Sequence, residues 1–185
     1  RAGNLDEALK LFYDRITEPT YYQFGAYQLR SELLRALFLD GEDKPPRLKK
    51  DSDQGWALTA LGASYNLSGQ PHQSIVVEQL SKEIDEKRGD KVGVAISLAN
   101  LGIRQLPIGT LSAAERNLRH SIDLCREIAD EWHEGIGHDE LGRLLAYTGN
   151  FSTADEHLEI AQRIFDKLGA GQVNDVSIVR AYRAL

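Results

Sequence analysis

Apolar residues recur every three or four positions along paired segments of the chain, and a glycine separates the two segments of each pair. In one first segment, Val94, Leu98 and Leu101 fall on a single helical stripe. Its second segment carries a stripe made of Leu111, Ala114, Leu118, Ile122 and Cys125. This spacing is typical of amphipathic helices, which bury such stripes against each other. The pattern therefore predicts an all-α protein built from pairs of antiparallel helices.

Two sets of glycines share one period. A Leu-Gly pair places the first set at 62, 102 and 142, and the second set stands at 69, 109 and 149, so both recur every 40 residues (102 − 62 and 109 − 69). A fixed period of this length indicates stacked repeats that shelter one another's apolar faces. We expect the second glycine to adopt a left-handed turn after the first helix. The first glycine stands within a helix, where we expect it to let the partner helix pack closely.

The period also predicts how the chain is divided. We expect one helical-repeat domain, with repeat units at 53–89, 90–129 and 130–169, an irregular part at 1–52 and a terminal helix at 170–185. The irregular part contains an exposed connector at 40–52. The segment from position 3 to 8 is similar to the one from 149 to 154, so we interpret the chain as a fragment of a longer protein.

Aromatic residues gather before this connector. Tyr21, Tyr22, Phe24 and Tyr27 are expected to open a long helix that continues to Phe38 and ends before a double proline. We interpret these rings as core residues, because apolar side chains at helical spacing usually are. A ligand platform is the alternative.

The repeats resemble the tetratricopeptide family, which places Leu-Gly in the first helix, an aromatic residue three positions later and small residues in the second helix. Leu61-Gly62 with Tyr65 fits this pattern, as do the small residues at 74, 114 and 154. The resemblance implies a right-handed superhelical array of antiparallel helix pairs, an α-solenoid. The family's usual period is about 34 residues, and Gln105 and Leu145 replace the later aromatics. The longer units look like the repeats of bacterial and archaeal signal-transduction ATPases of the STAND type.

In the family that the chain resembles, the first helix of each pair lines a concave binding face. Carried over to this chain, the resemblance implies candidate partner-binding residues at Trp56, Thr59, Asn66, Ile96, Ile103, Asp139 and Arg143. The face is unusually apolar, since only Arg143 and Asn66 are of the types that would hold a peptide's carboxylate. It therefore favours an apolar helix or a neighbouring domain. The open alternative is that Trp56, Ile96 and Ile136 pack between helices as core.

Charge and composition exclude several classes of partner. The formal net charge is −6, with acids and bases interspersed, which argues against nucleic acid and anionic membranes. No apolar run approaches the roughly 18 to 20 residues of a membrane span, and no signal peptide is evident, so we expect a cytoplasmic protein. The single cysteine, Cys125, is predicted to be a small buried hydrophobe.

No residue pattern predicts catalysis, and we expect no cofactor and no metal site. His133 and His138 are five positions apart, whereas two zinc ligands on one helical face need a spacing of four. His120 and His157 are expected at the surface. We hypothesise a scaffold that binds a protein or peptide, either separate or part of the same polypeptide, within a larger signalling protein. A structural module that self-associates into a homo-oligomer is the alternative, and an enzyme is a third, weaker one.

Overall fold

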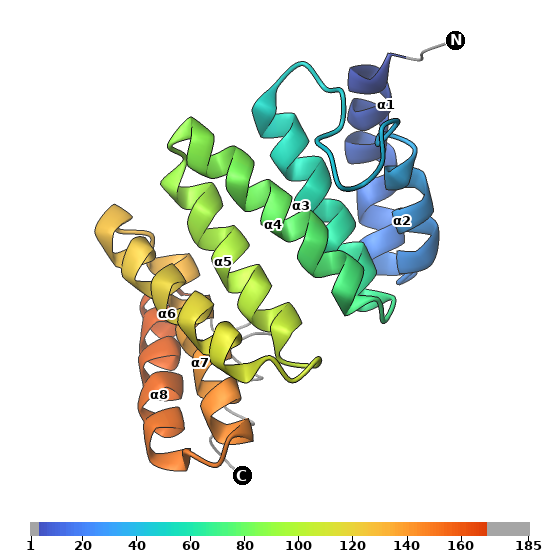
Figure 1. The fold of residues 1–185 in the computed structure, drawn as a ribbon. Coiled ribbons are helices and arrows are strands. Elements are labelled where there is room, and N and C mark those ends of the chain that lie inside the picture. The colour runs from blue at the N-terminus through green and yellow to red at the C-terminus, as the bar shows by residue number, and fades with distance from the viewer. Residues whose placement is uncertain (1–3, 170–185) are drawn as a thin grey trace. The chain divides into compact units, whose positions relative to one another are not determined.

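The computed structural model describes residues 4–169 and is helical there, with no strand in that range (Figure 1). This part divides into two compact units, one ending at Gly89 and one beginning at Asp90. The predicted all-α class is confirmed, and consecutive helices pack in pairs within each unit. The superhelical turn implied by the resemblance stays a prediction. The terminal helix expected at 170–185 and the first three residues lie outside the described residues.

The first unit opens with a helical stretch of mixed geometry and continues into longer helices. The elements are α1 (Leu5–Leu11), the π-helical turns η1 (Phe12–Ile16) and η2 (Pro19–Gln23), α2 (Tyr27–Arg35), α3 (Asp51–Leu67) and α4 (Pro71–Arg88). Helix α3 packs against both α2 and α4. Its fully buried Leu58 and Leu61 join Leu34 of α2 and Val77 of α4 in one core. The remaining side of α3 faces the segment that runs from α1 to η2.

The second unit contains two helix pairs of the predicted kind. They are α5 (Lys91–Gln105) with α6 (Leu111–Ile128), and α7 (Glu131–Tyr147) with α8 (Phe151–Lys167). Asp90 and Asp130 start α5 and α7, and each accepts a hydrogen bond from the backbone N–H three residues later, at 3.0 and 3.1 Å. Such capping stabilises a helix start by about 1 kcal/mol. Helix α7 packs between α6 and α8.

Both glycine predictions are confirmed. A Cβ built on Gly102 would lie 2.5 Å from Leu118 Cγ of α6 and 3.2 Å from the carbonyl oxygen of Ala114. Only a glycine lets α5 approach α6 so closely. The turn glycine Gly149 has φ +84°, in the left-handed region that residues with a side chain avoid. Cys125, predicted to be buried, is fully buried, and burial raises the pKa of its thiol to about 11.

The expected long helix from Tyr21 to Phe38 is wrong. Gly25, with φ +58°, breaks the chain, and α2 begins only at Tyr27. The core interpretation is also wrong for Tyr22 and Phe24, which are each 76% exposed. The physical reason is the π-helical geometry of η2, in which Phe24 N–H donates to the carbonyl of Pro19 five residues earlier. A π-helical turn has a smaller angular step per residue than an α-helix. Side chains spaced for an α-helix therefore do not all point to the core.

Most residues of the connector predicted at 40–52 are exposed, but Pro46 and Leu48 are buried. Leu48 is 5% exposed and belongs to the core of the first unit. The backbone N–H of Lys49 donates to Asp6 Oδ1 at 3.0 Å, which fastens the connector to α1. The connector and α1 therefore both flank the beginning of α3.

Candidate partner-binding groove

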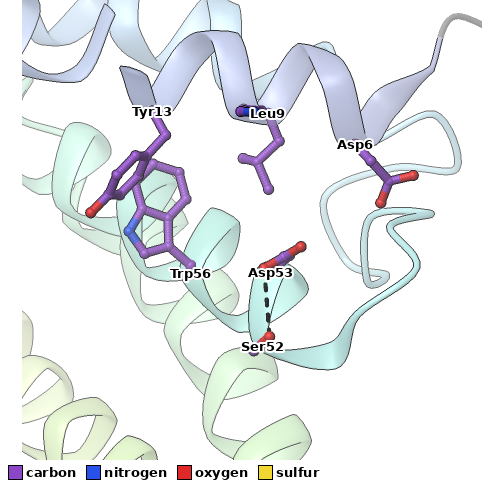
Figure 2. A pocket seen from close by; sticks show the side chains of 7 residues that line it. Asp6, Leu9, Tyr13, Ser52, Asp53 and Trp56 are labelled. Atoms are coloured by element: carbon purple, nitrogen blue, oxygen red, sulfur yellow. Dashed lines mark hydrogen bonds between the residues drawn. The ribbon is translucent and has the colours of Figure 1, made fainter. Parts of the chain in front are cut away.

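Two aromatic side chains meet beside α3 in the first unit. Trp56 of α3 and Tyr13 of η1 make an edge-on contact, with ring centroids 5.3 Å apart and planes inclined by 66°. Phe12 supports the indole from the core, at 6.3 Å. Tyr13 is 60% exposed, and Trp56 is partly buried. Figure 2 shows the two rings side by side, Tyr13 reaching down from the helix above and Trp56 rising from α3. The pair thus presents aromatic surface to solvent on a rigid base.

A hollow of about 480 Å³ lies on one side of this pair, between α1 and the first turns of α3. In Figure 2, Asp6 of α1 and Asp53 of α3 approach the hollow from opposite sides. Asp6 is already engaged, because it accepts the Lys49 backbone hydrogen bond and lies 3.7 Å from Lys49 Nζ. The lining consists of Asp6, Leu9, Lys10, Tyr13, Ser52, Asp53 and Trp56. This hollow is therefore mixed in charge.

A second hollow of about 460 Å³ lies on the other side of the pair, between the π-helical turns and the middle of α3. Its lining consists of Tyr13, Thr17, Glu18, Tyr21, Tyr22, Arg30, Trp56, Thr59, Ala60 and Ala63. Tyr13 and Trp56 line both hollows, so the two adjoin at the aromatic pair. We refer to both hollows together as the Trp56 groove. Along α3 the groove extends from Ser52 to Ala63, about 16 Å at the helical rise of 1.5 Å per residue.

Arg30 of α2 lines the second hollow from the protein interior. Only 3% of the residue is exposed. Its Nε donates to Ser64 Oγ at 3.1 Å and its Nη1 to the carbonyl oxygen of Thr17 at 3.4 Å. The guanidinium stacks over the rings of Phe12 and Tyr21, at 5.0 and 5.2 Å from their centroids. Burial lowers the pKa of Arg30. Within residues 4–169, no carboxylate forms an ion pair with it.

Two of the predicted binding residues, Trp56 and Thr59, line this groove. The Oγ1 of Thr59 also lies 3.2 Å from Ser81 Oγ, which fixes its side chain. Asn66 is half-buried near the end of α3 and is not part of the lining. Sequence reasoning missed Tyr13 and Arg30. The density of aromatics in this region supported a ligand platform as an alternative, but it did not indicate which rings would be exposed.

The remaining predicted residues belong to the second unit. Ile96 and Ile103 are half-buried on α5. Arg143 is half-buried, and its Nη1 donates to Glu140 Oε1 at 2.8 Å. Asp139 is 5% exposed, so the expectation of an exposed position is wrong. The reason is that α7 packs against α6 on one side and α8 on the other, which leaves little of its surface open.

A polar cluster occupies the second unit around a hollow of about 220 Å³. Arg126 Nη2 lies 2.8 Å from His138 Nε2, and because a guanidinium only donates, this nitrogen must accept. His138 therefore holds its proton on Nδ1 and donates it to His157 Nδ1 at 2.7 Å. Burial, the neighbouring imidazole and the cation Arg126 lower the pKa of His138 to about 3. Burial lowers the pKa of His157 too. Of the two histidines expected at the surface, His120 is exposed and His157 is half-buried.

Metal-binding and membrane-spanning features are both absent from the described part of the protein. Over residues 4–169, no three His, Cys, Asp or Glu side chains come together in a way that could hold a metal ion. None of the helices in that range combines the length and the apolar character that a bilayer crossing requires.

Comparison with known proteins adds information on the fold. No family model matches the chain, and no curated protein matches it either. The structure is similar to the crystal structure of BtubC (BKLC) from P. vanneervenii, with a TM-score of 0.73 and 18% sequence identity. The match covers 97% of this chain and 77% of that one. At this identity the similarity shows a shared helical fold and carries nothing about binding.

Proposed function

We propose that this protein is a helical-repeat scaffold that binds a peptide or an extended protein segment in the Trp56 groove. The observation that carries the proposal is the Tyr13–Trp56 pair, which stands between two hollows of 480 and 460 Å³. Tyrosine and tryptophan supply much of the binding energy at protein interfaces, because they bury a large area at a low cost in side-chain entropy.

The dimensions of the groove suit a short segment. An extended chain rises about 3.3 Å per residue, so the roughly 16 Å along α3 would hold about five residues. The π-helical turns η1 and η2 form one wall of the second hollow, and such turns occur frequently at functional sites. Both features support binding of a peptide across the aromatic pair.

The wider setting remains part of the proposal. The paired helices and the glycines at a period of 40 support tetratricopeptide-like repeats, in which case the chain would be the interaction region of a larger cytoplasmic signalling protein. Its partner would then be a separate protein or another domain of the same polypeptide. Self-association is the alternative, and static light scattering over a range of concentrations tests it. A molar mass that stays at the monomer value would exclude self-association.

A peptide library tests the proposal directly. The immobilised protein is panned against random dodecapeptides, and a selected peptide is synthesised and its affinity measured by calorimetry. Tyr13→Ala should weaken binding at least tenfold, which corresponds to about 1.4 kcal/mol. The matched control is Tyr147→Ala, which removes another exposed tyrosine (73%, against 60% for Tyr13) from α7 and should leave the affinity unchanged.

Two results would contradict the proposal. The library could yield no peptide that binds in solution, or the two tyrosine variants could bind the selected peptide equally well. Both tyrosines are more than half exposed, so either variant should fold, and a circular dichroism melt checks this.

A further inference from the structure

We propose that Arg30 receives a carboxylate of the bound segment in the second hollow of the Trp56 groove. This inference rests on the proposed function and specifies its ligand chemistry. It starts from a buried charge: Arg30 is 3% exposed, and in the described part of the protein no carboxylate pairs with it. A buried ion is costly unless it is paired. We therefore expect this guanidinium to bind a negatively charged group of a ligand.

The hydrogen bonds of Arg30 leave donors available. A guanidinium carries five N–H donors, and here Nε uses one for Ser64 Oγ and Nη1 uses one for the carbonyl of Thr17. The Nη2 group donates to nothing among residues 4–169. Since Arg30 lines the second hollow, its remaining donors are placed to meet a ligand that enters there.

The surroundings hold the guanidinium in place and strengthen its field. Phe12 and Tyr21 contact it through their rings, at 5.0 and 5.2 Å, and Ser64 fixes the Nε edge. A pre-oriented, poorly hydrated guanidinium forms charge-assisted hydrogen bonds about twice as strong as neutral ones. Tyr22 and Trp56 add aromatic walls to the same hollow, which reduce solvation of an entering anion.

A carboxylate fits this hollow better than a phosphate group. The planar fork of one guanidinium matches the two oxygens of one carboxylate. Glu18 also lines the hollow, and its Oε1 accepts a hydrogen bond from Gln23 Nε2 at 3.3 Å. Because Glu18 is exposed, water screens its repulsion of a single negative charge, whereas a phosphate dianion would be repelled more strongly. The carboxylate can come from an Asp or Glu side chain or from the free C-terminus of a peptide.

The stability of an Arg30→Met variant separates a binding role from a structural one. Ser64 Oγ donates to the carbonyl of Ala60 at 2.7 Å. Thr17 is half-buried and lines the open hollow, where water can take the place of the guanidinium. Neither group is therefore stranded when the guanidinium is removed. Methionine fills a similar volume, so the melting temperature should stay within a few degrees of the wild type. The more conservative Arg30→Lys keeps the charge but loses the fork.

The test pans wild type and Arg30→Met against two random peptide libraries. One library displays internal segments flanked on both sides, and the other ends in a free C-terminal carboxylate. The wild type should enrich Asp and Glu at least threefold at one position of the first library, or bind the second library's peptides at least tenfold more tightly than their amides. Arg30→Met should lose the preference. In wild type, the acid peptide should shift the NMR signal of Arg30 Nε–H more than its amide does.

The outcomes distinguish the two proposals. Peptides that bind the wild type but show no acidic preference, and whose acid and amide forms shift Arg30 Nε–H equally, would overturn the role of Arg30 and leave the groove intact. Recovery of no binding peptide from either library would overturn both. If Arg30→Met does not fold, the acid-against-amide comparison on wild type and on Arg30→Lys still decides the question.

Discussion

Alanine at position 102 tests whether the contact between α5 and α6 requires a glycine. The new Cβ would lie 2.5 Å from Leu118 Cγ, 2.9 Å from Leu118 Cδ2 and 3.2 Å from the carbonyl oxygen of Ala114. Non-bonded carbon atoms prefer about 3.5 to 4.0 Å, so the helices would have to separate by about 1 Å. Overpacking of this kind costs about 1–3 kcal/mol, and the better helix propensity of alanine returns about 1 kcal/mol. We expect Gly102→Ala to lower the free energy of unfolding by up to about 2 kcal/mol.

Urea denaturation followed by circular dichroism measures this loss, and a double-mutant cycle assigns its cause. Leu118 is 1% exposed, so Leu118→Ala alone should cost about 2–5 kcal/mol by leaving a cavity. In the double variant, the methyl group introduced by Gly102→Ala enters that cavity. The double variant should therefore be at least about 1 kcal/mol more stable than additivity predicts. A Gly102→Ala variant as stable as wild type, with an additive cycle, would refute the reasoning.

Three further predictions concern the turns, the histidines and the corrected N-terminal region. Gly149→Ala forces a side chain to φ +84° with no atom within 4 Å of its Cβ, so backbone strain alone should cost about 1 kcal/mol in thermal unfolding; an unchanged stability would contradict this. His138, with its pKa lowered to about 3, and His157 bind protons more readily in the unfolded state, where the pKa is near 6.5. Stability should therefore be full above about pH 7 and fall by about 1 kcal/mol or more between about pH 7 and 5, with a shallower fall in His138→Gln; a flat wild-type profile would count against the lowered pKa values of the two histidines. Phe24→Ser removes a ring that is 76% exposed and should change the free energy of unfolding by less than about 0.5 kcal/mol, whereas a loss of about 2 kcal/mol would return Phe24 to the core.

The helix pairs could be predicted from the sequence because their determinants are local and repeated. Gly102 and Gly142 recur at one spacing, and in both cases the close contact is with a leucine of the following helix. The small residue Ser74, predicted from the resemblance, is fully buried and its Oγ donates to the carbonyl of Gly62 at 2.6 Å. The apolar periodicity predicts the helix pairs even where the contacts between distant segments are unknown.

The site was harder to predict, because it depends on contacts between distant segments. Arg30 reaches Ser64, which is 34 positions away, and no pattern around Arg30 marks it as buried. The π-helical turns depend on a few backbone hydrogen bonds, which the spacing of aromatics does not reveal. The family resemblance placed Asp139 on the open binding face, but the helices packed on both sides of α7 decide its burial.

The two tryptophans of the protein provide the most direct test of the Trp56 groove. Trp56 lies in the groove, whereas Trp132 of the second unit packs against Phe165, with ring centroids 5.3 Å apart. Their indole N–H signals can be followed by NMR while a library-selected peptide is titrated into the intact protein. We predict that the Trp56 signal shifts in a saturable manner and that the Trp132 signal stays in place. Saturable binding that moves Trp132 and leaves Trp56 unchanged would contradict the account.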